Sequence, residues 1–179
     1  MTTYLVTGGT GSLGSALTKR LLECGEGRVV CVSRCEANQD NLVQQMGYNS
    51  NLYCRLGDIR DESRMVEIFE QEQPNVVFHF AAYKMVDKQE EDPHECIKTN
   101  VIGTYNVLKA SNRTKARTFV LSSTDKAVDP INVYGYTKAL AEKLVIKNIS
   151  EGLKTKVYRW GNVIGSRSSV IPTFIKSLV

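Results

Sequence analysis

The stretch TGGTGSLG, Thr7 to Gly14, decides the fold of this chain. A short apolar segment, Tyr4 to Thr7, leads into it. The segment that begins within it, Ser12 to Glu23, has apolar residues at helical spacing. Glycines spaced G-x-x-G-x-x-G permit a tight turn and close backbone approach to a pyrophosphate, and the N–H groups of a helix start favour anions. A generic turn is the alternative. Placement between strand and helix predicts instead a dinucleotide-binding turn formed by Gly8, Thr10, Gly11, Ser12, Leu13 and Gly14.

Strand-like and helix-like segments alternate along the rest of the chain. The predicted strands are Tyr4–Thr7, Arg28–Ser33, Leu52–Leu56, Val76–Phe80, Thr118–Ser122 and Lys156–Trp160. The predicted helices are Ser12–Glu23, Asn41–Met46, Glu62–Glu72, Glu95–Ala110, Tyr134–Asn148 and, after Pro172, Val170–Val179. Strands that alternate with helices of this length form βαβ units with right-handed crossovers. The sequence therefore predicts one α/β domain over residues 1–179, a doubly wound parallel sheet (Rossmann fold) in three αβα layers, with its ligand beyond the carboxyl ends of the strands.

Composition and charge exclude several classes of protein. The 179 residues carry a net charge of +4 without a long basic run, which gives nucleic-acid binding little support. The five cysteines lack C-x-x-C spacing, which predicts reduced thiols and a cytoplasmic protein. A signal peptide and a membrane-spanning apolar run are not expected. Because His79 and His94 lack ligand-like spacing, we predict structural roles for both and no metal site.

The second strand ends in SRCE, at the position where side chains distinguish NAD from NADP. An acidic residue at this place holds ribose hydroxyls, whereas an arginine accommodates a 2′-phosphate. Arg34, helped by Ser33, favours NADP over NAD, with Glu36 as a competing ribose contact and a solvated surface arginine as the alternative. Asp58 in GDIRD, with Ile59, is placed to contact adenine, or Asp58 caps the next helix. Small residues follow the fourth strand and leave room for a cofactor: Ala81 and Ala82.

The stretch STDKAVDPINVYGYTK, Ser123 to Lys138, predicts acid/base chemistry. Tyr134 and Lys138 stand four residues apart and share a helix face, so the lysine is expected to lower the tyrosine pKa. Tyr136 is two residues from Lys138 and lies on another face. A second charged pair, Asp125 and Lys126, ends the preceding strand. A turn with a surface ion pair is the alternative for these two residues.

Taken together, TGGTGSLG, AAYK, KTNVIGTYNV, SSTDKA, YGYTK and RWGNVIGSRSSVIPTF resemble the extended short-chain dehydrogenase/reductases. Among them the chain is similar to the nucleotide-sugar 4,6-dehydratases of polysaccharide biosynthesis, most closely the group that acts on UDP-N-acetylglucosamine and inverts C5. The resemblance implies a redox-neutral reaction. Hydride passes from sugar C4 to NADP+, water leaves across C5 and C6, and the hydride returns to C6.

The resemblance also implies roles for single residues. Tyr134 assists hydride transfer, and Lys138 also holds the nicotinamide ribose. Lys126 takes the C5 proton, which requires a neutral amine produced by burial or by Lys138, and Asp125 supports departure of water. Further polar positions of the family's cleft fall on Thr124, Lys84, Asn100, Asn162, Arg167 and Ser169. Lys84 and Asn100 are counted with the cofactor, Lys84 also with the sugar nucleotide, and Asn100 is alternatively a structural residue of its helix face. Arg167 is suited to the substrate diphosphate or is a solvated loop arginine.

Three departures separate the chain from that family. Trp160, Ser168 and Tyr83 replace a tyrosine, a glycine and a smaller residue. The C-terminal lobe that closes over the substrate is expected to be absent. Three hypotheses therefore stay open: a dehydratase, a non-catalytic NADP-binding module, and an NADP-dependent epimerase or reductase. A homo-oligomer is expected, with an apolar contact formed by Ile171, Phe174, Ile175 and Leu178.

Overall fold

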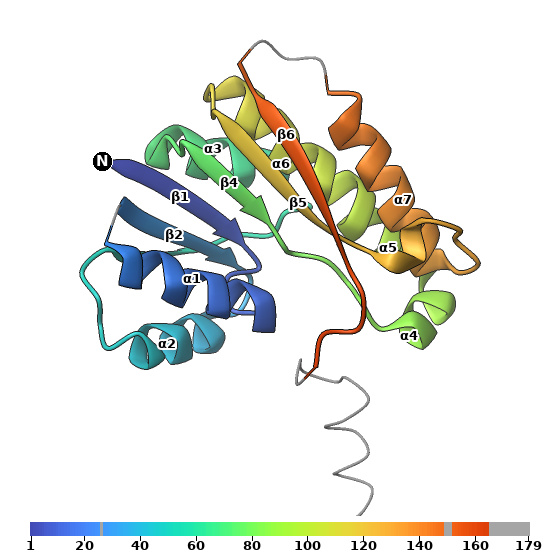
Figure 1. Ribbon diagram of the computed structural model, residues 1–179, viewed down its shortest axis with the longest axis horizontal. Coiled ribbons are helices and arrows are strands. Elements are labelled where there is room, and N and C mark those ends of the chain that lie inside the picture. The colour runs from blue at the N-terminus through green and yellow to red at the C-terminus, as the bar shows by residue number, and fades with distance from the viewer. Residues whose placement is uncertain (26, 149–151, 165–179) are drawn as a thin grey trace, which may run out of the picture.

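The computed structural model describes residues 1–25, 27–148 and 152–164, which build a twisted parallel sheet flanked by helices (Figure 1). Within these residues the strands are β1 (Thr2–Thr7), β2 (Gly27–Ser33), β3 (Leu52–Leu56), β4 (Val76–His79), β5 (Thr118–Thr124) and β6 (Lys154–Trp160). The order across the sheet is β3-β2-β1-β4-β5-β6, and every neighbouring pair is parallel. The winding reverses between β1 and β4, and such a reversal opens a crevice at the carboxyl ends of the strands.

Helices follow each strand except β6 within the described residues. They are α1 (Ser12–Cys24), α2 (Glu36–Gln45), α3 (Glu62–Glu72), α4 (Val86–Glu91), α5 (Pro93–Ile97), α6 (Thr104–Arg113) and α7 (Val133–Ile146). A π-helical segment η1 (Lys98–Gly103) joins α5 to α6, and a 3₁₀ turn η2 (Asp125–Ala127) follows β5. No helix in these ranges combines the length and apolar character that crossing a membrane requires.

Two buried clusters hold the layers together, one on each face of the sheet. The larger cluster packs α3, α6 and α7 onto the sheet through residues such as Phe69, Val107 and Val145. The smaller one packs α1 and α2 onto β1 and β2 around Cys31 and Leu42. Figure 1 shows α1 and α2 on one face and α3, α6 and α7 on the other. The predicted α/β architecture is confirmed.

One face of β6 remains open among the described residues. Its alternate residues Lys154, Lys156, Tyr158 and Trp160 are all exposed, with 50% of Tyr158 and 41% of Trp160 accessible. Successive side chains of a strand point to opposite faces, so these four share one face. The opposite face is packed, because Val157 contacts the larger cluster. Parallel sheets are normally covered on both sides, so the third layer is incomplete over β6 within the described residues.

The predicted boundaries were correct at Leu52–Leu56 and Glu62–Glu72 and differed elsewhere. Helix α2 starts at Glu36 instead of Asn41, and α4 was not predicted, because both segments are too polar to show an apolar period. The single helix expected over Glu95–Ala110 is divided into α5, η1 and α6. The helix predicted at Val170–Val179 lies outside the described residues.

His79, at the end of β4, ties the centre of the sheet to α6. Its Nδ1 is 2.7 Å from the Thr7 hydroxyl oxygen and its Nε2 is 2.9 Å from that of Thr104. Thr104 donates its own proton to the Asn100 carbonyl, so Nε2–H donates to Thr104 and Nδ1 accepts from Thr7. Burial, reinforced by the Lys138 charge, lowers the His79 pKa to about 3. The predicted structural role fits this neutral, fully bonded ring.

We predict that His79 makes the fold acid-sensitive. Its pKa falls from 6.5 to about 3 on folding, so the unfolded chain binds the extra proton between these values and stability is lost as pH falls below 6.5. In urea unfolding at pH 7.5, 6 and 5, the stability advantage of wild type over His79→Gln should shrink by up to about 1.4 kcal/mol per pH unit. An advantage that stays constant over this range would contradict the prediction.

Candidate active site

The turn between β1 and α1 has no room for side chains at two of its glycines. Gly8 has φ +69°, and a Cβ there would lie 2.7 Å from the Ala81 nitrogen. A Cβ on Gly14 would lie 2.2 Å from the Gly8 carbonyl oxygen. Gly11 caps α1 without a side-chain hydrogen bond, and the first turn of α1 carries no acidic residue. The helix start therefore presents backbone N–H groups and partial positive charge to an anion.

Two adjoining cavities open at the carboxyl ends of the strands on either side of this turn. The larger has a volume of about 630 Å³ and the smaller about 250 Å³. Both are lined by Gly8, Gly11, Phe80 and Ala82. The larger cavity also receives several predicted residues: Ser12, Leu13, Gly14, Lys84, Thr124, Lys126, Tyr134, Lys138 and Asn162. The smaller receives the predicted Thr10, Ser33, Arg34, Asp58, Ile59 and Ala81. The structure thus brings most of the predicted set to one continuous cleft.

The smaller cavity contains a network of charges. Arg60 donates from Nε to Oδ1 of Asp58 at 3.1 Å and to Oδ2 at 2.9 Å, and from a terminal nitrogen to Oδ2 at 2.6 Å. Arg34 approaches the same carboxylate at 3.7 Å. Burial alone would raise the Asp58 pKa, but the hydrogen bonds and charge of Arg60 and the charge of Arg34 lower it. Asp61, and not Asp58, caps α3 by accepting from the Arg64 amide, which removes the capping alternative for Asp58. Glu36 begins α2 and does not line either cavity.

Tyr134 and Lys138 lie on the first turns of α7, which Asn132 caps by accepting from the Gly135 amide. Lys138 is fully buried and donates to the Ser122 carbonyl at 2.6 Å. Burial lowers the Lys138 pKa to about 8, although the charge of Glu142 opposes this effect. Lys138 is therefore still mostly protonated near pH 7, but it loses its proton more readily than an ordinary lysine.

The predicted direction of the Tyr134 pKa shift is wrong. Burial raises this pKa, a hydrogen bond with the Thr124 side chain only partly offsets the effect, and the Asp125 carboxylate raises it further. Burial is the largest of these effects, and it disfavours the phenolate. The structure nevertheless places the Tyr134 and Thr124 side chains together, as the predicted site requires.

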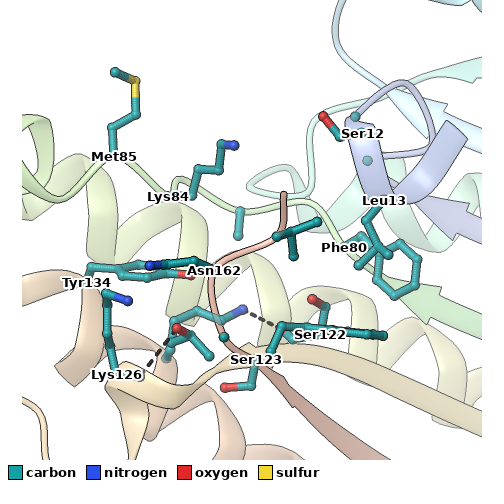
Figure 2. Close-up of a pocket in the computed structure, with 18 of the residues that line it drawn as sticks. Ser12, Leu13, Phe80, Lys84, Met85, Ser122, Ser123, Lys126, Tyr134 and Asn162 are labelled. Carbon is teal, nitrogen blue, oxygen red and sulfur yellow. Dashed lines mark hydrogen bonds between the residues drawn. The ribbon is translucent and has the colours of Figure 1, made fainter. Parts of the chain in front are cut away.

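Lys126 is not buried as its predicted role requires. Its side chain is 38% exposed and pairs with Asp125 at 3.2 Å across the η2 turn. Asp125 also accepts from the Thr124 hydroxyl at 2.9 Å, and this bond, with the Lys126 contacts, lowers the Asp125 pKa. Lys126 lines the larger cavity, whereas Asp125 does not. Figure 2 shows Lys126, Tyr134 and Asn162 gathered on the side of the cavity opposite Ser12 and Leu13.

The sequence analysis did not identify Glu142, a buried carboxylate next to Lys138. Glu142 lies one turn after Lys138 on α7 and is almost fully buried. Ser123 donates to it at 2.5 Å, and Arg159 of β6 donates to both of its oxygens at 3.0 and 2.7 Å. The available signal was a glutamate four residues from Lys138, on the same buried helix face.

Asn100 contacts neighbouring segments of the protein in place of the expected cofactor. It is completely buried in η1 and lines neither cavity. Its side-chain oxygen accepts from the Tyr83 amide at 2.8 Å, and its nitrogen donates to the Tyr83 carbonyl at 3.2 Å and to Thr137 at 3.2 Å. These contacts favour the structural alternative, because Asn100 holds the loop after β4 against α7.

Other residues complete the description of the site. Residues that the sequence analysis did not assign also line the larger cavity, among them Met85, Val86, Asp87 and Trp160. The predicted substrate residues Arg167 and Ser169, and the predicted oligomer contact at Ile171, Phe174, Ile175 and Leu178, lie outside the described residues. Across the ranges that the structure describes, no group of three or more His, Cys, Asp or Glu side chains could hold a metal ion.

The phosphate-binding turn, the crevice at the sheet reversal and the paired Tyr134 and Lys138 define a domain of the short-chain dehydrogenase/reductase class. Within it, the chain belongs to the family described as polysaccharide biosynthesis protein, whose model matches residues 4–179.

Three known proteins illustrate this membership. The UDP-N-acetylglucosamine 4,6-dehydratase (inverting) of Campylobacter jejuni is 40% identical over 177 residues, covering 96% of this chain and 52% of that protein. The UDP-glucose 4-epimerase of Rickettsia rickettsii is 42% identical over 186 residues, covering 98% and 53%. The X-ray structure of Pen from Bacillus thuringiensis superposes with a TM-score of 0.92 at 37% identity, covering 99% and 55%. The chain therefore spans about half the length of these relatives.

We predict that Gly14→Ala disrupts the phosphate-binding turn. Its new Cβ would meet the Gly8 carbonyl oxygen at 2.2 Å, so backbone must move. Calorimetric titration with NADP+ should show at least about a tenfold weaker Kd, equivalent to about 1.4 kcal/mol. Ser15→Ala on the same helix loses only a 3.2 Å bond to the Ser12 carbonyl and serves as the control. Equal affinity in the two variants would contradict this account of the turn.

A second prediction concerns the charge beneath Lys138. Glu142→Gln keeps an oxygen that can accept from Ser123 and Arg159 but removes the negative charge that raises the Lys138 pKa. The Lys138 pKa should then fall below its value of about 8. NMR titration of the lysine side chain measures the change, with the exposed Glu62→Gln as control. An unchanged Lys138 titration would show that Glu142 does not tune it.

Proposed function

We propose that this chain carries the cofactor cleft and the acid/base residues of an NADP-dependent nucleotide-sugar 4,6-dehydratase that acts on UDP-N-acetylglucosamine and inverts C5. One observation carries the proposal: Thr124, Lys126, Tyr134 and Lys138 come together in a cavity that continues into the phosphate-binding turn. A bound nicotinamide cofactor would supply the hydride acceptor and return the hydride. The protein's part is to position the sugar and to move protons.

Each residue of the cavity takes one part of this work. In its phenolate form, which burial disfavours, Tyr134 accepts the proton of the sugar C4 hydroxyl, and Thr124 beside it orients the phenol. Lys138 provides a buried cation next to the nicotinamide ribose. Lys126 abstracts the C5 proton after C4 becomes a ketone, while Asp125 holds its amine at 3.2 Å and assists departure of the C6 hydroxyl. Closure of the site over the sugar must reduce the exposure of Lys126, because a solvated ammonium is a poor base.

NADP is the proposed cofactor because Arg34 lies at the end of β2 and lines the smaller cavity. An arginine at this place accommodates a 2′-phosphate, and half of its side chain is accessible to a ligand. The phosphate-binding turn accepts the pyrophosphate of NAD equally well, so discrimination rests on the Arg34 end of the cleft.

The nucleotide half of the substrate requires more protein than the described residues supply. The chain spans about half the length of the dehydratase and epimerase relatives. The open face of β6 and the exposed Trp160 at the mouth of the larger cavity are suited to receive further protein. We propose that a substrate-closing lobe, from residues beyond those described or from another copy in a homo-oligomer, completes the site.

A nucleotide-sugar 4-epimerase is the second candidate, favoured by the 42% identity to the Rickettsia rickettsii epimerase. Both reactions begin with oxidation at C4, so both need Tyr134 and Lys138. Only the dehydratase needs a base for the C5 proton. The role of Lys126 therefore separates the two candidates, and a non-catalytic NADP-binding module would need neither function.

The test incubates the purified chain with NADP+ and UDP-N-acetylglucosamine and follows the products by mass spectrometry and NMR. We expect a product lighter by one water from wild type and from the exposed-surface control Lys98→Ala. Lys126→Ala should form no product, while its Kd for NADP+ stays within about twofold because the side chain lies at the sugar end of the cleft.

Three outcomes would contradict parts of this proposal. A sugar of unchanged mass with inverted C4 would favour the epimerase. Full dehydratase activity in Lys126→Ala would exclude Lys126 as the base. NADP+ binding without any change to the sugar would favour the binding module or a requirement for a further chain.

A further inference from the structure

We propose that Tyr83 is a cofactor-specificity residue whose phenol hydroxyl, together with the Arg34 guanidinium, binds the 2′-phosphate that distinguishes NADP from NAD. This inference rests on the proposed NADP-dependent function and deepens it. The proposed function already assigns Arg34 to the 2′-phosphate. The new element is its pairing with Tyr83, a tyrosine from the loop after β4.

The position of Tyr83 is set by buried contacts of its backbone. Asn100 accepts from the Tyr83 amide at 2.8 Å and donates to the Tyr83 carbonyl at 3.2 Å. Because Asn100 is completely buried, the backbone at Tyr83 is anchored to the protein interior. Its half-buried side chain lines the smaller cavity together with Arg34, Asp58 and Ser33. A rigid backbone makes the direction of the phenol a property of the fold.

The side chains of Tyr83 and Arg34 converge although the residues are 49 positions apart in sequence. A terminal guanidinium nitrogen of Arg34 is 3.5 Å from the Tyr83 hydroxyl oxygen. The guanidinium carbon is 5.6 Å from the centre of the tyrosine ring, within the range of a cation–π contact. The ring therefore helps to orient the guanidinium, and the hydroxyl lies beside it at the cavity wall.

The contacts of the Arg34 guanidinium with Asp58 and Tyr83 are long. Its distance to the Asp58 carboxylate is 3.7 Å, and its distance to the Tyr83 hydroxyl is 3.5 Å. The Asp58 carboxylate is already engaged by Arg60 at 2.6 and 2.9 Å. The exchange of such long contacts for short, charge-assisted bonds to a phosphate is favourable. Arg60 also neutralises Asp58, which would otherwise repel an anion.

A 2′-phosphate matches this pair of donors in chemistry. It presents several acceptor oxygens, so one can take an N–H of Arg34 while another takes the O–H of Tyr83. The 2′-hydroxyl of NAD carries no charge and gains much less from a cation. Loss of the tyrosine hydroxyl should therefore weaken NADP binding selectively and leave NAD binding nearly unchanged.

The experiment measures Kd values for NADP+ and NAD+ by calorimetry in wild type, Tyr83→Phe and Tyr83→Leu. We expect Tyr83→Phe, which keeps the ring, to weaken NADP+ binding about tenfold and to change NAD+ binding less than twofold. Tyr83→Leu also removes the ring that orients Arg34 and should weaken NADP+ binding further. Adenosine 2′,5′-bisphosphate and 5′-AMP, titrated in parallel, should reproduce the same selectivity because they differ only in the 2′-phosphate.

A matched control is available on α6. Lys109 lies 5.6 Å from the ring centre of Tyr105, the same distance as in the Arg34–Tyr83 pair, but outside both cavities. Tyr105→Phe should leave both cofactor affinities unchanged. Circular dichroism and thermal unfolding verify that each variant is folded.

The outcomes separate this inference from the proposed function. Wild type that binds NADP+ more tightly than NAD+, with Tyr83→Phe showing the same preference, would overturn the inference alone. An equal loss of NADP+ and NAD+ affinity in Tyr83→Phe would also overturn it, because the hydroxyl would then serve the shared part of the cofactor. Wild type that binds neither dinucleotide would overturn the proposed function itself.

Discussion

The close approach of backbone to backbone at the first turn is the constraint on which the rest of this structure depends. The Gly8 amide donates to the Val32 carbonyl at 2.9 Å, and the Gly11 amide donates to the Gly8 carbonyl at 2.9 Å. Gly8 also lies against the backbone at Ala81, with no space for a Cβ between them. The ends of β1, β2 and β4 are thereby brought to one place. The cleft exists because these three strand ends meet without intervening side chains.

Burial determines which side chains of the cleft have pKa values that the surrounding protein shifts. Lys138 is enclosed, bonded to the Ser122 carbonyl and influenced by Glu142, so the surrounding protein controls its proton affinity. Lys126 stays accessible and pairs with Asp125 at 3.2 Å. The two lysines of the cleft therefore lie in different environments, one enclosed by protein and the other 38% exposed. Burial also raises the Tyr134 pKa and so favours the protonated phenol.

The alternation of strands and helices was predictable because local patterns carry it. The apolar run of β3 and the helical period of α3 were sufficient to place both elements at their observed bounds. Helices α2 and α4 present mostly polar side chains, so their formation depends on tertiary packing around Leu42 and Gln89 and leaves little trace in the apolar period. The π-helical turn at Asn100 likewise has no local signature, since its reason is the set of contacts to Tyr83 and Thr137.

Local sequence was sufficient to predict the glycine-rich turn, the order of the elements and the placement of Tyr134 and Lys138 on one helix face. Each of these follows from the spacing of residues close together in the chain, and such spacing can be read from the sequence without knowledge of the fold. Only the tertiary structure decided that Glu142 lies beneath Lys138 with Ser123 and Arg159, that Asn100 anchors a loop, and that Arg34 meets Tyr83. Apart from the helix neighbours Lys138 and Glu142, these relations join residues 17 or more positions apart, so they depend on how the strands are ordered and how deeply each side chain is buried.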